Sequence, residues 1–462
     1  MRRRRGLVVL VGFSLVLASC AGHGDAPACA MAPFAAPAWQ AGSATGALAR
    51  SICMSAATAT LLAPISDEAR ALGFAVRDDD RCDLRIAVAL ATASGAAGMP
   101  DWAAHADGFA WTSTVDGSSR VVTLFANDAR GAHFAAHALL AASRDAGGVM
   151  PSAAADWPAF AERGVIEGFY NRYFSREERA TTLRLMHELR ENTYLYAPKD
   201  DPYAGYQWRT PYQAEAAADI AAAASLAASL HVDFIFGISP TLSTNGKDPA
   251  SSIMFSSAAD FATLLAKLNS LKALGVTRFA LLYDDASDAL YHAEDRAIYP
   301  TLAAAHADLA NRLTTALGAP LLMVGDYYSS QFGGWEDYNR ELGQKLLPLV
   351  RVMWTGPSVF SQTIAPADLT EINQLLGQPV AIWDNWPTSA EPVTGRDPQL
   401  FSATDAILTN ATLVGDSGHP VSDFWLVLPS LADYAWSPTT YSADASFAVA
   451  QLSEPAMVTC AR

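Results

Sequence analysis

The sequence predicts an α/β protein, in which a (β/α)8 barrel is preceded by a small α/β domain. From residue 163 onward, short apolar segments alternate with helical patterns, and we identify eight such segments. Eight strands that alternate with helices over about 275 residues match a barrel in number and in length. A doubly wound open sheet is the alternative, but no GxGxxG motif and no P-loop follows a strand.

The barrel is expected to span residues 160–440, with a C-terminal tail at 441–462. Its predicted strands are Gly164–Tyr170, Thr193–Ala197, Asp233–Ile238, Phe279–Tyr283, Leu321–Val324, Val352–Trp354, Val380–Trp383 and Ala406–Leu408. Helical patterns between them include Ser175–Arg190, Gln213–Leu230, Ser257–Leu274 and Tyr299–Leu317. The second of these helices is rich in Ala, the residue with the highest helix propensity.

The preceding segment, residues 46–155, is the predicted small α/β domain. Its expected elements are a strand at Arg85–Leu90, hairpin strands at Phe109–Thr114 and Arg120–Phe125, and a helix at Ala129–Arg144. The hairpin is predicted because Asp116-Gly117 favours a tight turn. The acidic run Asp78-Asp79-Asp80 predicts a solvated loop rather than a metal site.

Residues 1–19 have the pattern of a secretory signal peptide. Four arginines precede the apolar run Leu7–Leu17, which is too short to span a bilayer. The run ends in Leu17-Ala18-Ser19-Cys20, which resembles the bacterial lipobox, in which the cysteine becomes the lipidated first residue. Residues 20–45 would then be a lipidated tether that holds an exported protein on the bacterial cell envelope without spanning the membrane. A plainly cleaved secreted protein is the alternative.

The remaining cysteines allow two disulfide bonds. Cys53–Cys82 would cross-link the N-terminal domain and Cys29–Cys460 would join the chain ends, but four cysteines permit three connectivities. Free thiols are the alternative. No CxxC pair and no HExxH motif occurs, so neither a metal nor a cofactor is expected.

The charge of the chain excludes one broad class of function. Lys and Arg number 31 against 47 Asp and Glu, which gives a net charge of −16. A chain this acidic repels polyphosphate, so we do not expect a nucleic-acid partner.

Polar and aromatic residues collect at the expected C-terminal ends of the barrel strands, where the active sites of such barrels are built. The polar residues there are Glu167, Lys199, Asp200, Asp201, Ser239, Asp284, Asp285, Asp326, Thr355, Asp384, Asn385 and Asn410. Aromatic rings stack on sugar C–H groups while polar groups bind hydroxyls, so this combination suits a carbohydrate. A phosphate site would need more basic residues and glycine-rich loops. The alternative is that strand ends are polar because they meet water.

The apolar strand Phe279–Tyr283 delivers two carboxyl groups side by side, Asp284 and Asp285. Like charges held close together raise one pKa, so that one carboxyl group can act as an acid near neutral pH. Paired carboxylates are typical of glycoside hydrolysis, although the pair normally comes from different strands. An adjacent pair suits substrate-assisted hydrolysis, in which the 2-acetamido oxygen of the substrate is the nucleophile. A strand-ending turn and a divalent-ion site are the alternatives.

Five ordered segments resemble glycoside hydrolase family 84, the O-GlcNAcase and hyaluronidase-type N-acetylglucosaminidases. They are Gly164–Tyr170 with Arg172, Asn192–Asp201 with Trp208-Arg209, Phe279–Asp285, Trp354–Pro357 and Trp383–Asn385. The resemblance covers roughly residues 160–435, and the five segments together are specific where any one would not be. The unit before the barrel also resembles the small α/β domain of bacterial members.

The resemblance implies a retaining, substrate-assisted removal of terminal β-linked N-acetylglucosamine through an oxazoline. By position, Asp284 resembles the carboxylate that orients the acetamido group, and Asp285 resembles the general acid/base. Tyr328 matches a tyrosine that holds the acetamido group and the intermediate. The other matched sugar contacts are Gly168 through its backbone, Lys199, Asn385, Asn410 and Trp383, which matches a wall of the N-acetyl pocket. Lys199 could instead pair with Asp200 or Asp201, Asn410 could be a loop amide, and Trp383 could belong to the barrel core.

One segment departs from the family pattern. After Asn385 the family usually has an Asn-Asp pair whose Asp holds the outer hydroxyls of the sugar, whereas this chain continues Trp386-Pro387. Glu391 and Asp397 are the candidate substitutes, so the choice between gluco and galacto configuration stays open. The departure motivates an alternative function, a weakened barrel that binds N-acetylhexosamine without turnover. Retention of both aspartates favours the enzyme.

A second motif has a simpler interpretation. Gly415–His419 is similar to the nucleophile loop of chymotrypsin-like proteases. Those proteases are all-β and need a separately placed His and Asp, which the alternating α/β pattern contradicts. We therefore expect a glycine-rich loop.

Overall fold

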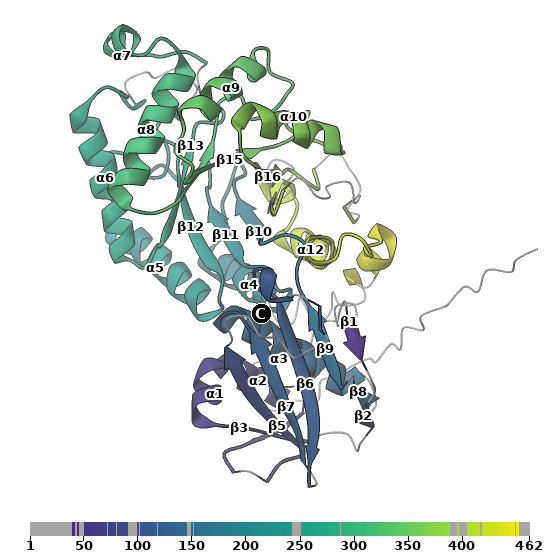
Figure 1. The fold of residues 1–462 in the computed structure, drawn as a ribbon. Coiled ribbons are helices and arrows are strands. Elements are labelled where there is room, and N and C mark those ends of the chain that lie inside the picture. The colour runs from purple at the N-terminus through teal and green to yellow at the C-terminus, as the bar shows by residue number, and fades with distance from the viewer. Residues whose placement is uncertain are drawn as a thin grey trace, which may run out of the picture.

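The computed structural model describes residues 39–41, 44–45, 50–71, 73–79, 81–90, 99–100, 102–117, 119–145, 149–150, 152–242, 251–286, 288–388, 395–396, 404–415, 418–448 and 450–451. Figure 1 shows two units, an α/β domain in purple and blue and a larger barrel in teal and green. The predicted fold class is confirmed by this arrangement. No helix in these ranges is both long enough and apolar enough to cross a bilayer.

The larger unit is a closed barrel of parallel strands that follow one another in chain order. The strands are β10 (Glu162–Glu167), β11 (Thr193–Tyr196), β12 (Asp233–Ile238), β13 (Arg278–Leu282), β14 (Leu321–Val324), β15 (Val350–Trp354), β16 (Ala381–Asp384) and β17 (Ala406–Asn410). The barrel closes where β10 pairs with β17, with Gly164 opposite Leu408. Strand β10 ends three residues before the predicted Tyr170, so that Gly168 and Tyr170 belong to the barrel mouth.

Helices surround the barrel. They are α4 (Arg176–Glu188), α5 (Ala214–Ser229), α6 (Ala258–Ala273), α7 (Ala293–Ile298), α8 (Leu302–Leu317), α9 (Trp335–Lys345), α10 (Pro366–Leu376), α11 (Thr412–Gly415) and α12 (Val421–Trp436). The four predicted helices are found, with ends shifted by local capping. Ser175 and Glu178 form a capping box that starts α4. Helix α8 starts at Leu302 rather than Tyr299, because the Thr301 side chain accepts from the backbone of Ala304 and caps the helix there.

The barrel has two apolar layers, because side chains alternate between the two faces of each strand. The inner layer consists of Ile166, Leu195, Ala197, Ile235, Ala280, Leu282, Leu322, Val324, Met353, Ala381, Trp383, Ala406 and Leu408. The opposite faces of the strands pack against the helices in a separate cluster. Alternation therefore places the side chains of Leu282 and Val324 inside the barrel, at the last residues of β13 and β14 before the mouth.

The N-terminal unit is a mixed sheet with helices. Its seven strands, in spatial order, are β1 (Trp39–Ala41), β9 (Ala153–Asp156), β6 (Phe109–Asp116), β7 (Ser119–Ala126), β5 (Leu84–Leu90), β3 (Ser51–Met54) and β4 (Ala75–Arg77). Strand β2 (Ala44–Thr45) pairs with β8 (Val149–Met150), and the helices are α1 (Ala56–Leu61), α2 (Ala63–Ala71), α3 (Ala129–Asp145) and the short η1 (Trp102–Ala104). The predicted hairpin is present, with Asp116 opposite Ser119.

The segment 20–45 was expected to be a tether, but the structure contains strands in the last part of this segment. Trp39–Ala41 pairs antiparallel with Ala153–Ala155 and forms an edge strand of the sheet. Its backbone groups are thus hydrogen-bonded to β9, an interaction that the Ala- and Gly-rich composition did not indicate. The sheet therefore begins inside the segment that was expected to be a linker.

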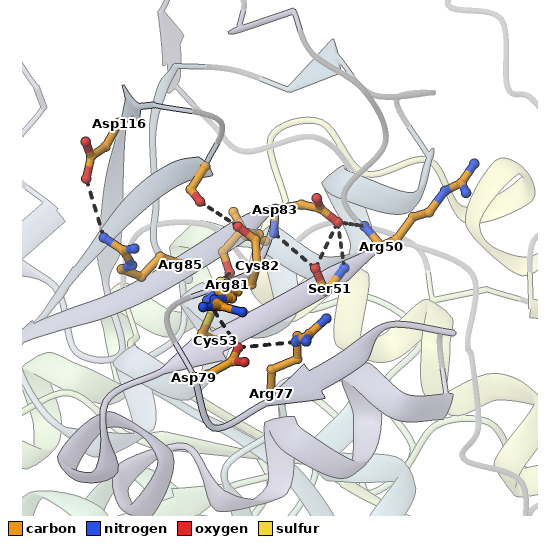
Figure 2. Close-up of a disulfide and its surroundings, with 12 residues drawn as sticks. Arg50, Ser51, Cys53, Arg77, Asp79, Arg81, Cys82, Asp83, Arg85 and Asp116 are labelled. Carbon is orange, nitrogen blue, oxygen red and sulfur yellow. Dashed lines mark hydrogen bonds and ion pairs between the residues drawn. A yellow bond between two sulfur atoms is a disulfide. The ribbon is translucent and has the colours of Figure 1, made fainter.

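A disulfide bond joins Cys53 in β3 to Cys82 just before β5, as one of the predicted pairings proposed (Figure 2). The two cysteines are 29 residues apart, and closing a loop of this size contributes about 3–4 kcal/mol in the chain-entropy account. Beside it, Oδ2 of Asp83 accepts from the backbone N of Arg50 at 2.8 Å and of Ser51 at 3.0 Å. The Arg50 hydrogen bond is the main cause that lowers the pKa of Asp83. Cys20, Cys29 and Cys460 lie outside the described residues.

A buried charge cluster joins the two units. Asp107 of the N-terminal unit accepts from Arg130 Nε at 2.5 Å, from Arg163 Nη1 at 2.9 Å and from Asn192 Nδ2 at 2.7 Å. Burial opposes the ionisation of Asp107, but the guanidinium groups of Arg163 and Arg130 hold its pKa below the usual value. Helix α12 makes a second connection (Figure 1), because Trp436 at its end packs in the core of the N-terminal unit.

Candidate active site

The site residues expected from the sequence lie together at the C-terminal mouth of the barrel. Gly168, Lys199, Asp284, Asp285, Tyr328, Trp383, Asn385 and Asn410 lie at or just beyond the ends of β10, β11, β13, β14, β16 and β17. Two clusters can be distinguished among them. The carboxyl group cluster is built on Asp284 and Asp285, and the amide cluster is built on Asn385 and Asn410.

Asp284 is buried and forms an ion pair with Lys199. Nζ of Lys199 contacts Oδ2 of Asp284, and the two side chains are only 2% and 9% exposed. Lys199 therefore does not form the alternative pair with Asp201, which accepts instead from the hydroxyl groups of Tyr196 and Tyr212. Oδ1 of Asp284 is buried and has no hydrogen-bond partner among the described residues, so its acceptor capacity is unused.

The environment of Asp284 changes its acidity. Burial raises the pKa of Asp284 above the usual value for an aspartate, and the negative charge of Asp285 adds to this effect. The ammonium group of Lys199 acts in the opposite direction. The lysine thus supports the ionised form of a carboxyl group that burial alone would keep neutral.

Asp285 is exposed and is held by two tyrosine hydroxyl groups. Tyr170 donates to Oδ2 at 2.6 Å and Tyr328 donates to Oδ1 at 2.8 Å. Asp285 has a left-handed backbone (φ 58°), which departs from the strand direction directly after Asp284. Burial, followed by the charge of Asp285, raises the pKa of both phenols far above the usual range, so both remain donors.

Sequence reasoning placed Tyr170 in the first strand but assigned it no role. The available signal was an aromatic residue with a hydroxyl group two positions after Gly168. Gly415 supports this tyrosine from below, because a Cβ at position 415 would lie 2.2 Å from the Tyr170 carbonyl oxygen. Farther along the same segment, Nδ1 of His419 lies 2.7 Å from Oδ2 of Asp423. Asp416 and Ser417 of the protease-like motif lie outside the described residues.

The amide cluster connects three strands. Oδ1 of Asn410 accepts from the Gly168 backbone N at 3.0 Å, and Nδ2 of Asn410 donates to Oδ1 of Asn385 at 2.9 Å. Nε1 of Trp383 donates to the same Asn385 oxygen at 2.8 Å. The orientation of both amide groups is fixed by these bonds, and a rigid polar surface results.

Trp383 belongs both to the inner core and to the site. Its ring packs in the inner apolar layer, and its centroid lies 5.8 Å from Nζ of Lys199. A Cβ at Gly168 would lie 2.6 Å from the indole ring, so only glycine fits at this position. Trp383 therefore forms a wall between the amide cluster and the Lys199–Asp284 pair.

Other charged strand-end residues serve the fold. Glu167 is fully buried and accepts from Arg179 at 2.8 and 2.9 Å. Asp384 accepts from Arg396 at 3.0 Å, and burial raises the pKa of Asp384 although Arg396 opposes the shift. Arg396 was not found from the sequence, because nothing near it in the chain indicates its partner.

Two expected features cannot be placed. Glu391 and Asp397, the candidate contacts for the outer hydroxyl groups of the sugar, lie outside the described residues. Within the described ranges, no group of three or more His, Cys, Asp or Glu side chains is arranged to hold a metal ion.

The arrangement can perform acid/base chemistry on a glycosidic bond. An exposed carboxyl group held by hydroxyl donors lies next to a buried carboxyl group with a free oxygen, at the mouth of a (β/α)8 barrel. Paired carboxyl groups beside a polar and aromatic surface are typical of the active sites of glycoside hydrolases. The fold and the site thus define a (β/α)8-barrel glycoside hydrolase.

Comparison with known proteins identifies the family. A family model described as beta-N-acetylglucosaminidase matches residues 163–458, which is more than half of the chain. The chain belongs to this family, glycoside hydrolase family 84. The matched segment begins within β10 and includes every expected catalytic and sugar-contact residue.

The relatives support the same assignment. Protein O-GlcNAcase from Rattus norvegicus and from Mus musculus is 33% identical over 261 residues, covering 54% of this chain and 27% of each relative. The chain thus spans about a quarter of the length of these curated relatives. A mutant of the Thermobaculum terrenum O-GlcNAc hydrolase is similar in structure, with a TM-score of 0.58, 29% identity, and coverage of 65% and 64% of the two chains. The structure named CpGH84B shares the fold, with a TM-score of 0.71 and 21% identity over 89% of this chain and 73% of that one.

Proposed function

We propose that the protein removes terminal β-linked N-acetylglucosamine from a glycan or glycoconjugate, by a retaining and substrate-assisted mechanism. The observation that carries this proposal is the geometry of the adjacent carboxyl groups. Asp284 is buried, paired with Lys199 and has an unused Oδ1, whereas Asp285 is exposed between Tyr170 and Tyr328. Asp284 suits the acceptance of a hydrogen bond from the substrate, and Asp285 suits proton exchange with solvent.

In the first step, Oδ1 of Asp284 accepts a hydrogen bond from the acetamido N–H of the bound sugar. This makes the acetamido oxygen more nucleophilic and directs it at C1. The bond from that oxygen to C1 forms, the glycosidic C1–O bond breaks, and Asp285 gives its proton to the leaving oxygen. The product is the protonated oxazoline (an oxazolinium ion), whose positive charge is stabilised by the nearby carboxylate of Asp284.

In the second step, water attacks C1 and gives a proton to Asp285. The bond between C1 and the acetamido oxygen breaks, and the sugar is released with its original configuration. The Tyr328 hydroxyl group contacts Asp285 and lies where it can also reach the acetamido oxygen. The Trp383 indole is the proposed wall of the N-acetyl pocket, while Lys199, Asn385, Asn410 and the Gly168 backbone are the proposed sugar contacts.

The alternative of a binding module without turnover is not favoured by the site. A module that had lost turnover would have no need for the two tyrosine donors on Asp285 or for the lysine on Asp284. The names of the relatives point in the same direction, since the matched proteins are an O-GlcNAcase and an O-GlcNAc hydrolase.

The test is turnover of an aryl β-N-acetylglucosaminide beside the matching N-acetylgalactosaminide and glucoside. We expect hydrolysis of the first and none of the glucoside, because the glucoside lacks the acetamido nucleophile. Asp284→Asn should lose at least about a hundredfold in kcat, whereas Asp200→Asn, an exposed carboxylate on the same rim, should retain activity. Binding of the sugar without hydrolysis by a folded protein would instead support the binding module. The galactosaminide will report whether the segment after Asn385 still selects the configuration at C4.

We also propose that the protein is exported and anchored to the bacterial cell envelope through a lipid on Cys20. The support is the charged and apolar N-terminal segment that ends in Leu17-Ala18-Ser19-Cys20. Incorporation of labelled palmitate by the full chain, and its loss in Cys20→Ser, would test this. Equal labelling of both proteins would contradict it.

A further inference from the structure

A third carboxyl group, Asp326, lies beside the catalytic pair and has no role in the mechanism above. Strands β13 and β14 run parallel with Leu282 opposite Val324, and the Tyr283 backbone N donates to the Val324 carbonyl oxygen at 3.0 Å. Asp284 and Asp326 each follow this register pair by two residues. The two aspartates therefore leave neighbouring strands at the same level of the barrel mouth.

The backbone of Asp326 is fixed by a buried network. Its N–H lies 3.2 Å from the Tyr338 hydroxyl oxygen, which is 2.7 Å from Nδ1 of His306. Because a backbone N–H can only donate, the Tyr338 oxygen accepts there and forms a second hydrogen bond with Nδ1 of His306. Burial lowers the pKa of His306 to about 3, so this ring is neutral.

The same network contacts the residue that precedes Asp284. The Tyr283 ring stacks on the His306 ring, with centroids 3.7 Å apart and an angle of 3° between the planes. A Cβ at Gly325 would lie 2.9 Å from the Tyr338 ring, so the outer side of this segment is filled. Tyr283 and Asp326 are therefore held by one shared structure, and their relative position is rigid.

The carboxyl group of Asp326 forms no hydrogen bond or ion pair with another described residue, and it is surrounded by acidic groups. Burial is the main cause that raises the pKa of Asp326 to about 7, and the charges of Asp288, Asp284 and Asp285 contribute to the same shift in that order. Tyr327, Tyr328 and Tyr338 also face its charge. The ammonium group of Lys199 is already paired with Asp284. Asp326 therefore changes charge in the neutral range, close to the catalytic pair.

We propose that Asp326 is a positioning residue whose carboxylate charge disfavours negative charge on Asp284 and Asp285, and so sets the pH range of catalysis. The electrostatic interaction is reciprocal. The neighbouring carboxylates disfavour a charge on Asp326, and a charged Asp326 disfavours their charges in turn. When Asp326 is charged, the pair retains its shared proton to higher pH. This inference deepens the proposed function and uses its turnover as one readout.

The test is the pH profile of kcat/KM in Asp326→Asn, which removes the charge and preserves the shape. The alkaline limb of the profile should move to lower pH by about 0.5–1 unit, the order expected for the loss of one neighbouring charge at intermediate dielectric. The acidic limb should not move, because Asp326 is already neutral at low pH. Activity at pH 8 should fall several-fold relative to the wild type. Asp326→Glu should restore the alkaline limb, and Asp337→Asn, an exposed carboxylate at the start of α9, should not move it.

A second measurement separates this inference from the proposed function. In protein labelled with [13C]carboxyl aspartate, the resonances of the pair should shift with a midpoint near pH 7, and Asp326→Asn should abolish that midpoint. Asp288→Asn should move the midpoint to lower pH, because Asp288 is the first of the charges that raise the pKa of Asp326. An active wild type with identical limbs in Asp326→Asn overturns the role of Asp326 alone. An inactive protein that shows the midpoint overturns the proposed function and leaves the electrostatic coupling supported.

Discussion

The hydroxyl oxygen of Tyr170 lies 2.6 Å from Oδ2 of Asp285, so that a residue just beyond β10 reaches across the barrel mouth to the end of β13. Tyr328 occupies the other oxygen at 2.8 Å. Because both phenols keep their protons, both act as donors to this carboxyl group. Tyr170 thus helps to hold the proposed acid/base in place from across the barrel mouth.

Replacing Tyr170 with Phe removes one donor and leaves the ring. We expect Asp285 to be held less firmly, so substrates with poor leaving groups, which depend most on a well-placed acid, should lose up to roughly tenfold in kcat/KM. Activated aryl glycosides should lose less. Tyr173→Phe changes an exposed neighbouring tyrosine and serves as the control. Equal losses on both kinds of substrate would show that this hydrogen bond has no part in proton transfer.

Lys199→Met should move the acidic limb of the pH profile of kcat/KM. Lys199 lowers the pKa of Asp284 against the stronger effect of burial, so its removal raises that pKa further. The mechanism needs Asp284 ionised, and therefore the acidic limb should move to higher pH while kcat falls about a hundredfold. Lys272→Met, an exposed lysine in the last turn of α6, is the matched control. An acidic limb at the wild-type position would contradict the role of Lys199 as the counter-charge of Asp284.

Much of the barrel could be predicted because its signals are local. Short apolar segments and helical spacing recur with a regular period, and caps such as Ser175 lie within a few residues of the helices that they start. Asp233–Ile238 and Leu321–Val324 match the predicted strands at both ends. The resemblance to a family then located the expected site residues, all of which lie at the same end of the barrel.

The features that were missed depend on contacts between distant parts of the chain. Asp107 is 56 residues from Arg163 and 85 from Asn192, and Arg396 is stacked 5.1 Å from the Trp386 ring centroid in a segment without a recognisable motif. The edge strand at Trp39–Ala41 exists only because β9 returns beside it. No pattern within a short window carries this information, since each contact is defined by the tertiary structure.

Asp107→Ala should destabilise the connection between the two units. It would leave Arg163, which is fully buried, without its carboxylate partner. Breaking a buried pair in this way costs about 3–5 kcal/mol of unfolding free energy. Asp116→Ala, which removes an exposed ion pair with Arg85, should cost less than about 1 kcal/mol. Urea denaturation followed by tryptophan fluorescence measures both, and equal losses would show that the Asp107 cluster does not stabilise the interface.

At Glu191, in contrast to Asp107, a substitution should increase the free energy of unfolding. It is almost fully buried, Oε2 has no partner among the described residues, and burial raises its pKa from 4.5 to about 8 although Arg163 opposes the shift. The folded protein therefore keeps the proton over a range in which the unfolded chain loses it. The stabilising contribution of this group is complete below pH 4.5 and is lost as the pH rises toward 8.

Glu191→Gln should remove that loss, because the amide cannot ionise in either state and fills the same space. At pH 7 the variant should be more stable than the wild type by about 3 kcal/mol, and the difference should shrink toward zero at pH 4.5. Glu177→Gln, an exposed position in the first turn of α4, should show no such dependence on pH. Urea denaturation at pH 4.5, 6 and 7.5 provides the comparison. A stability difference that stays constant over this range would mean that Glu191 is already ionised in the folded protein, with Arg163 as its counter-ion.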